Sequence, residues 1–243
     1  MSGPPAPDPA AADFAEVELL SFDCYGTLID WETGILDALG SLFHRHDRDR
    51  PPAETLLTRY AAHESAAEHG PWVPYREVLA RVGEGLAEDH GLELAPTERD
   101  FLAESLPDWP PFADTVASLR ALAARFRLAV VSNVDEALFA RTQKSLGVDF
   151  DFVITAEATR SYKPDRAIFD EASRRFGVAR ARHLHCAQSL WHDVAPARAA
   201  GWRTVWVDRR GGRSGGATPD SDARPERRVG SLAELARALG VTP

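Results

Sequence analysis

The chain has only two cysteines, two lysines and no apolar run long enough to cross a membrane. Two cysteines, Cys24 and Cys186, do not make a disulfide framework, so we expect a cytoplasmic protein. The formal net charge is −9, whereas nucleic acids and anionic membranes attract basic proteins, so neither is an expected partner. Because Arg supplies the other basic residues, the two lysines, Lys144 and Lys163, stand out.

The first residues of the chain, 1–12, are rich in proline and alanine. They lack the basic start and the apolar stretch of a signal peptide, so we expect a disordered leader. The length of 243 residues suits one large domain or a main domain with a smaller insert.

Short apolar runs alternate with helical patterns along most of the chain. The run "VELLSFD" ends in Asp23, and continuous runs of this kind are typical of strands buried in a parallel sheet. Expected strands cover 17–23, 127–133, 150–157, 182–188 and 203–208, and expected helices between the later strands cover 136–146, 165–176 and 193–200. This alternation predicts an α/β fold whose parallel sheet is covered by helices on both faces.

The alternation is interrupted once, after the first strand. Residues 31–109 show no strand pattern but several helical ones, at 34–45, 54–69, 74–89 and 97–105. We therefore expect a core made of 13–30 and 110–243, with an all-helical cap, 31–109, inserted into it. A cap at this point lies beside the edge of the sheet where open α/β folds bind ligands, and it can close over a site.

The C-terminal part of the chain carries fewer signals. The segment 209–228 is rich in glycine and arginine, so we expect a loop there. Ser231 and Glu234 form the pattern of a capping box, which predicts a last helix, and Gly240 is well placed to end it.

Polar residues follow four successive strands of the predicted sheet. They are Asp23, the pair Ser132 and Asn133, Lys163 and Asp193. Each is a weak signal alone, because aspartate often ends a strand and "SN" is an ordinary turn. Parallel strands bring their carboxyl ends to one crevice, so the shared position of the four signals predicts a site.

The stretches "SFDCYGTLID", "VVSNVD", "SYKPD" and "HDVAPARAAG" resemble, in order and spacing, the four motifs of the haloacid dehalogenase (HAD) superfamily. The resemblance spans nearly the whole chain, including a helical cap after the first motif. It implies a HAD-like core, which is a Rossmann-like parallel sheet. Most members of the superfamily are phosphatases, so the resemblance alone does not give the reaction.

The resemblance implies a role for each motif residue. Asp23 would be the nucleophile, forming a covalent intermediate that water hydrolyses. Lys163 would neutralise its carboxylate, and Asp193 would orient or activate the water. Thr27 would hydrogen-bond the nucleophile or the product carboxylate.

Tyr25 is the position that separates two reactions. Superfamily phosphatases usually carry a second aspartate there, which protonates the leaving alkoxide, whereas a halide leaves without a proton. The opening "DCYGTL" resembles that of the L-2-haloacid dehalogenases. Phosphatases also bind Mg²⁺ with a carboxylate where this chain has Gln188, and a neutral amide weakens such a site. We therefore expect no metal and no cofactor, with a Mg²⁺-dependent phosphatase of a small metabolite as the alternative.

Further residues are expected to bind the substrate. Ser132 would hold the substrate carboxylate, and Asn133 would help to cradle the halide near a helix N-terminus. Arg59 of the cap aligns with the family's arginine, with Arg76 as its rival. Gln188 and His192 stand where the family pattern differs. They are candidates to replace its missing hydrogen bonds, and His192 is either a base beside Asp193 or a supporting residue.

Departures from the dehalogenase pattern also occur at Leu190 and Phe169, where the family has asparagine and tyrosine. The prediction is a hydrolase that cleaves the carbon–halogen bond of a short 2-haloacid and releases a 2-hydroxy acid. The expected partner is a small-molecule substrate, with a homodimer possible by analogy with relatives. A protein that binds without catalysis is the third reading, and the intact set of Asp23, Lys163 and Asp193 argues against it.

Overall fold

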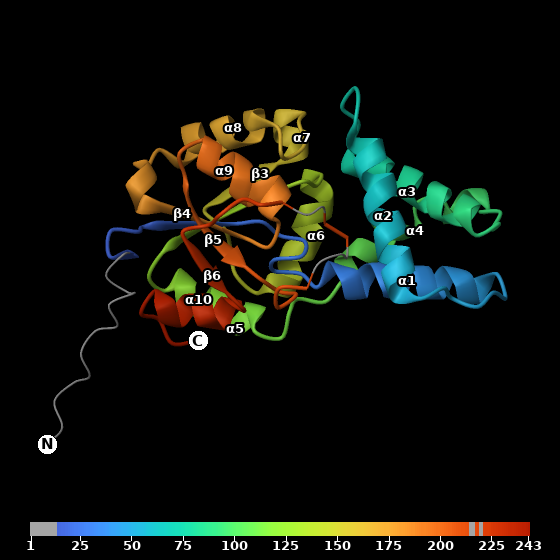
Figure 1. Ribbon diagram of the computed structural model, residues 1–243, viewed down its shortest axis with the longest axis horizontal. Helices are drawn as coiled ribbons and strands as arrows, with labels where there is room; N and C mark the ends of the chain where they lie inside the picture. Colours follow the sequence, from blue (N-terminus) through green and yellow to red (C-terminus); the bar gives the residue numbers. More distant parts are fainter. Residues whose placement is uncertain (1–13, 214–216, 219–220) are drawn as a thin grey trace, which may run out of the picture.

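A parallel sheet of six strands forms the centre of the computed structural model (Figure 1), which describes residues 14–213, 217–218 and 221–243. The expected leader, 1–12, lies outside these residues. The sheet has the order β3-β2-β1-β4-β5-β6, and every neighbouring pair is parallel. The strands are β1 (Leu19–Phe22), β2 (Arg127–Ser132), β3 (Phe152–Thr155), β4 (His183–Ala187), β5 (Arg203–Val207) and β6 (Arg227–Val229). The chain leaves β1 toward β2 and later returns beside it as β4, so the strand order reverses at β1, where α/β sheets bind ligands.

Alternation along the strands builds two separate apolar layers. In β2, Leu128 and Val130 pack with one core cluster, and Ala129 and Val131 pack with the other. Successive strand residues point to opposite faces, so a continuous apolar run can supply both layers. The first layer includes α5 (Thr115–Ala123) and α10 (Leu232–Ala238), and the second includes α8 (Arg166–Phe176) and α9 (Ala195–Ala199). The expected α/β class is therefore confirmed.

A helical region follows β1 and lies to one side of the sheet (Figure 1). It contains α1 (Trp31–Arg45), α2 (Ala53–Glu68), α3 (Tyr75–Asp89) and α4 (Phe101–Ser105). The Asp30 side chain caps α1 by accepting from the Thr33 amide at 3.3 Å. The amide of Asp30 donates to the Pro110 carbonyl at 2.8 Å, so the two ends of the insertion are bonded together.

Several boundaries differ from the prediction. The helix expected at 97–105 is a 3₁₀ turn, Pro96–Glu98, followed by the short α4, and the helix expected at 193–200 begins earlier, as the π-helical turn Leu190–Val194. The expected loop 209–228 runs into β6, an edge strand with the sequence "RRV". An edge strand this short carries no apolar run, so its composition did not reveal it.

The last helix begins with a side-chain cap as expected. The Ser231 hydroxyl accepts from the Glu234 amide at 3.1 Å, while the Glu234 carboxylate accepts from the amide of Gly230 and not from that of Ser231. Gly240 takes a left-handed conformation, with φ of 74°, directly after this helix. Within the described part of the chain, no helix has both the length and the apolar character that crossing a membrane requires.

Candidate active site

Asp23 lies directly after β1, at the carboxyl edge of the sheet, and only 7% of its surface is exposed. Its two carboxylate oxygens have different partners. Thr27 Oγ1 donates to Oδ2 at 2.7 Å, and Lys163 Nζ donates to Oδ1 at 2.9 Å. Gly26 has a φ of 90°, and this left-handed conformation lets the turn bring Thr27 back to the carboxylate. Burial raises the pKa of Asp23, and the ammonium of Lys163 opposes this by favouring the charged form.

Lys163 is the centre of the charged cluster. Its buried ammonium donates to Asp23 Oδ1, to Asp193 Oδ1 at 2.8 Å and to the carbonyl oxygen of Val131 at 3.0 Å. An ammonium has three donors, and this geometry uses all of them. Burial lowers the pKa of Lys163, but the charges of Asp193 and Asp23 outweigh it and the net shift is upward. Lys163 therefore stays charged between two carboxylates.

Asp193 receives a second hydrogen bond that the sequence did not predict. His185 Nε2 lies 3.0 Å from Asp193 Oδ1, and His185 Nδ1 lies 2.7 Å from the Ser21 hydroxyl, which also bonds His183 Nε2. A carboxylate only accepts, so His185 donates to it from Nε2. Burial tends to raise the pKa of Asp193, but Lys163 and His185 lower it. Asp193 Oδ2 is buried and has no hydrogen-bond partner among the described residues.

His183 and His185 lie on the same face of β4, where both bond the hydroxyl of Ser21. Their hydrogen bonds were missed because their partner, Ser21, lies in an otherwise apolar strand. The signal was present, since β1 and β4 are neighbours that pair Ser21 with His185. Burial lowers the pKa of His183 to about 3, so it is neutral at physiological pH.

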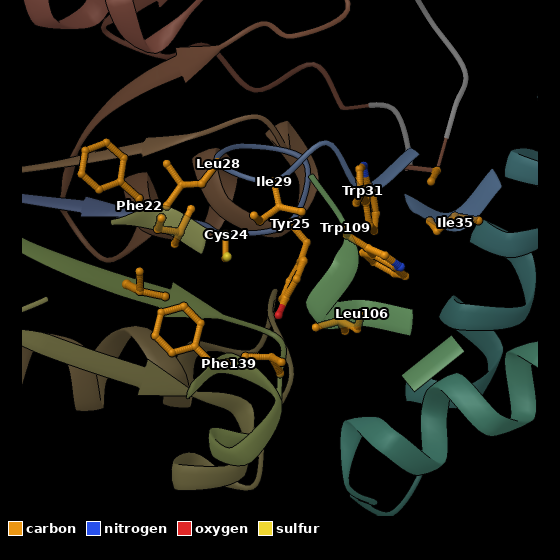
Figure 2. Close-up of a cluster of buried hydrophobic side chains, with 14 of the residues drawn as sticks. Phe22, Cys24, Tyr25, Leu28, Ile29, Trp31, Ile35, Leu106, Trp109 and Phe139 are labelled. Carbon is orange, nitrogen blue, oxygen red and sulfur yellow. The ribbon is translucent and has the colours of Figure 1, made fainter. Parts of the chain in front are cut away.

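Tyr25 turns its hydroxyl group away from Asp23. The Tyr25 hydroxyl lies 2.9 Å from Thr142 Oγ1 in α6 (Glu136–Leu146), and the ring stands edge-on to Trp109 with centroids 5.9 Å apart. Figure 2 shows the ring of Tyr25 beside Trp109, with its hydroxyl group on the side where Phe139 lies. Burial raises the pKa of Tyr25 well above its usual value. The residue thus contributes a ring to the site and no available acid.

Asn133 holds a backbone segment in place. Its Oδ1 accepts from the Lys163 amide at 2.7 Å, and its Nδ2 donates to the Lys163 carbonyl at 3.1 Å and to Glu68 Oε1 at 3.4 Å. The expected role of Asn133 as a halide cradle stays a prediction, because its side chain lines the cavity beside Asp23 while its amide group bonds the lysine loop. Ser132 ends β2 and lines the cavity. Helix α6 begins at Glu136, so its N-terminus is not directly at Ser132 or Asn133.

The turn after β4 supplies the next group of polar side chains. The Gln188 amide donates to Thr27 Oγ1 at 2.9 Å, and its side-chain Oε1 accepts from the Thr218 hydroxyl at 3.2 Å. Ser189 Oγ accepts from the amide of His192 at 2.8 Å and lies 3.1 Å from its Nδ1. Burial lowers the pKa of His192 to about 4, so this imidazole is neutral at pH 7.

The expected cap arginine does not reach the site. Arg59 lies on the outer side of α2, where it binds Asp89 through two hydrogen bonds of 2.6 and 2.7 Å, and its rival Arg76 binds Asp100 and Glu104. Successive helical residues are rotated by about 100°, so Arg59 points elsewhere when the next residue, Tyr60, points inward. The assignment of Arg59 was wrong by this rotation.

Two glutamates of α2 face the core instead. Glu64 is buried, and its Oε1 accepts from the hydroxyls of Tyr75 at 2.7 Å and Tyr60 at 3.2 Å. Glu68 is one helical turn further along the same face and meets Asn133. Burial raises the pKa of Glu64 to about 7 and that of Glu68 well above its usual value. Tyr60, Glu64 and Glu68 follow one another at intervals of four residues, and this spacing was the sequence signal that the three share one face of α2.

Core and cap residues together enclose a narrow space, which we call the inner cavity. Among the described residues, no arginine lines it. Its walls include Asp23, Tyr25, Ser132, Asn133, Lys163, Gln188, His192 and Asp193 from the core, and Trp31, Glu64, Glu68 and Tyr75 from the inserted helices. Thr27 bonds Asp23 but is not one of the wall residues, and Arg59 is not one of them either. The arrangement presents a buried carboxylate, a fixed cation and a second carboxylate with one oxygen that has no hydrogen-bond partner among the described residues.

The inner cavity is also informative about metal binding. A Mg²⁺ site needs several oxygen ligands, commonly carboxylates. Asp23 and Asp193 each give one oxygen to Lys163, and the neighbouring positions hold the phenol of Tyr25 and the amide of Gln188. The described part of the chain has no group of three or more acidic, histidine or cysteine side chains placed to hold a metal ion.

Comparison with known proteins agrees with this geometry. The family of haloacid dehalogenase-like hydrolases matches residues 17–201. An (S)-2-haloacid dehalogenase of Pseudomonas putida is 26% identical over 236 residues, which are 92% of this chain and 96% of that protein. The haloacetate dehalogenase H-2 of Moraxella sp. (strain B) is 27% identical over 202 residues, covering 81% and 88%.

Solved structures show the same architecture. A crystallised L-2-haloacid dehalogenase has a TM-score of 0.78 and 25% identity, covering 92% of this chain and 99% of the other. The L-2-haloacid dehalogenase of Xanthobacter autotrophicus with chloropropionic acid covalently bound has a TM-score of 0.75 and 20% identity, covering 92% and 98%. This chain, with its sheet, its inserted helices and its four motifs at one edge, belongs to the haloacid dehalogenase-like hydrolases.

Proposed function

We propose that this protein hydrolyses the carbon–halogen bond of a short 2-haloacid through an ester on Asp23. The observation that carries the proposal is the position of Tyr25, whose hydroxyl is bound to Thr142 and not directed at the nucleophile. An alkoxide leaving group needs a proton from such a position, whereas a halide does not. The names of the similar proteins from Pseudomonas putida and Moraxella support the same reaction.

In the first step, a carboxylate oxygen of Asp23 attacks C2 of the substrate. The new C–O bond forms as the carbon–halogen bond breaks, and the halide leaves with the electron pair. Lys163 and Thr27 hold the two oxygens of Asp23 at 2.9 and 2.7 Å, which orients the carboxylate for attack.

In the second step, water attacks the ester carbonyl carbon of Asp23. Asp193 Oδ2 is the proposed base, because it is buried, has no hydrogen-bond partner among the described residues and belongs to the cavity wall. The bond between this carbonyl carbon and the substrate oxygen then breaks, and that oxygen takes the proton that Asp193 received from the water, which gives the 2-hydroxy acid. Asp23 returns to its carboxylate by releasing the second proton of the water to solvent. His185 and Lys163 hold the other oxygen of Asp193 and keep the carboxylate in place.

A paired assay tests the proposal. Halide release is measured with chloro-, bromo- and fluoroacetate and 2-chloropropionate in the presence of EDTA, beside a panel of phosphate esters with and without Mg²⁺. We expect halide release that survives EDTA and is abolished by Asp23→Asn. Phosphate release that strictly requires Mg²⁺, with no halide release, would identify a phosphatase and overturn the proposal. Wild-type halide release by Asp23→Asn would also overturn the proposal.

A further inference from the structure

A larger space, the outer chamber, adjoins the inner cavity. The two spaces share Glu68, Lys163 and His192 as wall residues, so they lie side by side. The centre of a water molecule can occupy about 590 Å³ of the outer chamber but only about 40 Å³ of the inner cavity. Asp23 lines the inner cavity and not the outer chamber, so a two- or three-carbon acid bound at Asp23 would leave the outer chamber without an occupant.

The outer chamber is lined by two tryptophans from different parts of the chain. Trp191 belongs to the turn after β4, two residues before Asp193, and is 46% exposed. No other large apolar side chain of the described residues is classed as exposed. Trp72 comes from the segment between α2 and α3, and its Nε1 is buried without a hydrogen-bond partner in the described part. Exposed aromatic surface beside a reaction centre is typical of ligand binding.

Contacts between the core and the inserted helices fix the Trp72 wall. The hydroxyl of Tyr162, the residue before Lys163, donates to the Val73 carbonyl at 2.8 Å. Asp135 of the core accepts from the amides of Tyr75 and Arg76 at 2.7 and 2.8 Å, which caps the first turn of α3. The segment that carries Trp72 is therefore hydrogen-bonded to two loops of the core, the one that contains Lys163 and the one that follows β2.

Arg160 supports Trp72 from the core side. Its guanidinium carbon lies 5.1 Å from the centroid of the Trp72 ring, within the range of a cation–π interaction. Arg160 has a left-handed φ of 51°, which is unfavourable for a residue with a side chain. No carboxylate of the described residues forms an ion pair with it. Its cationic group instead stacks on the ring of Trp72, and Arg160 is itself a wall residue of the outer chamber.

We propose that the outer chamber binds a planar apolar group on the substrate, so that the preferred substrate is an aryl-substituted 2-haloacid. This rests on the proposed function, which puts C2 of the substrate at Asp23 in the inner cavity. In the proposed complex, the group beyond C2 extends between the side chains of Glu68, Lys163 and His192 into the outer chamber and packs on Trp191 and Trp72. A rigid aromatic wall gives contact area with little loss of side-chain freedom.

Two paired comparisons test the chamber. For turnover, kcat/KM is measured with 2-bromo-3-phenylpropionate and with 2-bromopropionate. For binding, calorimetry compares the unreactive 3-phenylpropionate with propionate. One stacked aromatic contact predicts a preference of roughly tenfold for the phenyl compound in each comparison. Trp191→Ala should remove most of that preference and leave kcat/KM for 2-bromopropionate within about twofold, while Trp191→Phe should retain most of it.

The binding arm separates this proposal from the proposed function. If 3-phenylpropionate binds more tightly through Trp191 but no halide is released from any substrate, the reaction is wrong and the chamber assignment stands. If halide is released but neither phenyl compound is preferred, the chamber assignment is overturned and the reaction stands. A preference that persists unchanged in Trp191→Ala also overturns it.

Discussion

Glu64 is a buried acid whose charge is poorly tolerated, so Glu64→Gln should stabilise the protein in a pH-dependent way. Its carboxyl group lies in the inner cavity, and the hydroxyls of Tyr60 and Tyr75 both donate to the same oxygen, Oε1. Burial is the largest influence on its pKa and raises it from 4.5 to about 7. Glutamine keeps an oxygen that can accept from both hydroxyls and cannot become charged.

The magnitude follows from the two pKa values. Below pH 4.5 the carboxyl is protonated in both the folded and the unfolded chain, so it contributes no penalty. As the pH rises toward 7, the unfolded chain loses this proton while the folded protein retains it, and the free energy of unfolding falls. Above pH 7 the penalty is constant. A difference between about 7 and 4.5, at 1.36 kcal/mol per pH unit, gives about 3 kcal/mol.

Urea denaturation at pH 5 and pH 8.5 measures this difference. Glu64→Gln should raise the free energy of unfolding by up to about 3 kcal/mol at pH 8.5, and by far less at pH 5. Glu88→Gln is the control, because Glu88 is an exposed carboxylate on α3. Equal effects of Glu64→Gln at both pH values, or destabilisation at pH 8.5, would refute the reasoning. In the proposed reaction, kcat/KM for an anionic haloacid should fall above about pH 7 in the wild type and level out in Glu64→Gln.

Three further substitutions test individual assignments. Arg59→Ala should leave kcat/KM for haloacids within about twofold, because a surface ion pair contributes roughly 1 kcal/mol or less to stability and Arg59 does not line the cavity. Tyr25→Phe should lower the melting temperature through loss of a hydrogen bond of about 1 kcal/mol, yet keep halide release within a few-fold; a complete loss would show that the hydroxyl acts in catalysis. Asp135→Ala should destabilise the protein by about 1 to 2 kcal/mol, measured by urea denaturation, and raise KM, whereas Asp135→Asn should retain much of the cap.

The positions of the catalytic candidates were accessible from the sequence because they depend on local patterns. Asp23, Lys163 and Asp193 each follow a recognisable strand, and parallel strands bring such residues together whatever the details of packing. Their contacts of 2.8 and 2.9 Å fit the expected cluster. The inserted helical region was also readable, since 31–109 shows several helical patterns and no strand pattern.

The residues that were missed or misplaced depend on rotation and pairing. Arg59 and Tyr60 are adjacent, yet Arg59 faces solvent and Tyr60 is buried in the core, and only the three-dimensional packing of α2 decides which. Glu64 was overlooked because a glutamate on a helix is usually solvated. The bond between His185 and Asp193 required knowing that β4 pairs with β1.

The central claim is that an ester forms on the carboxyl group of Asp23. One enzyme equivalent is allowed to consume less than one equivalent of haloacid in water enriched with oxygen-18, and the peptide containing Asp23 is then examined by mass spectrometry. Attack of water on the ester carbonyl carbon should place one heavy oxygen on Asp23 and leave the first 2-hydroxy acid unlabelled. A heavy oxygen in that first product, with none on Asp23, would contradict the account.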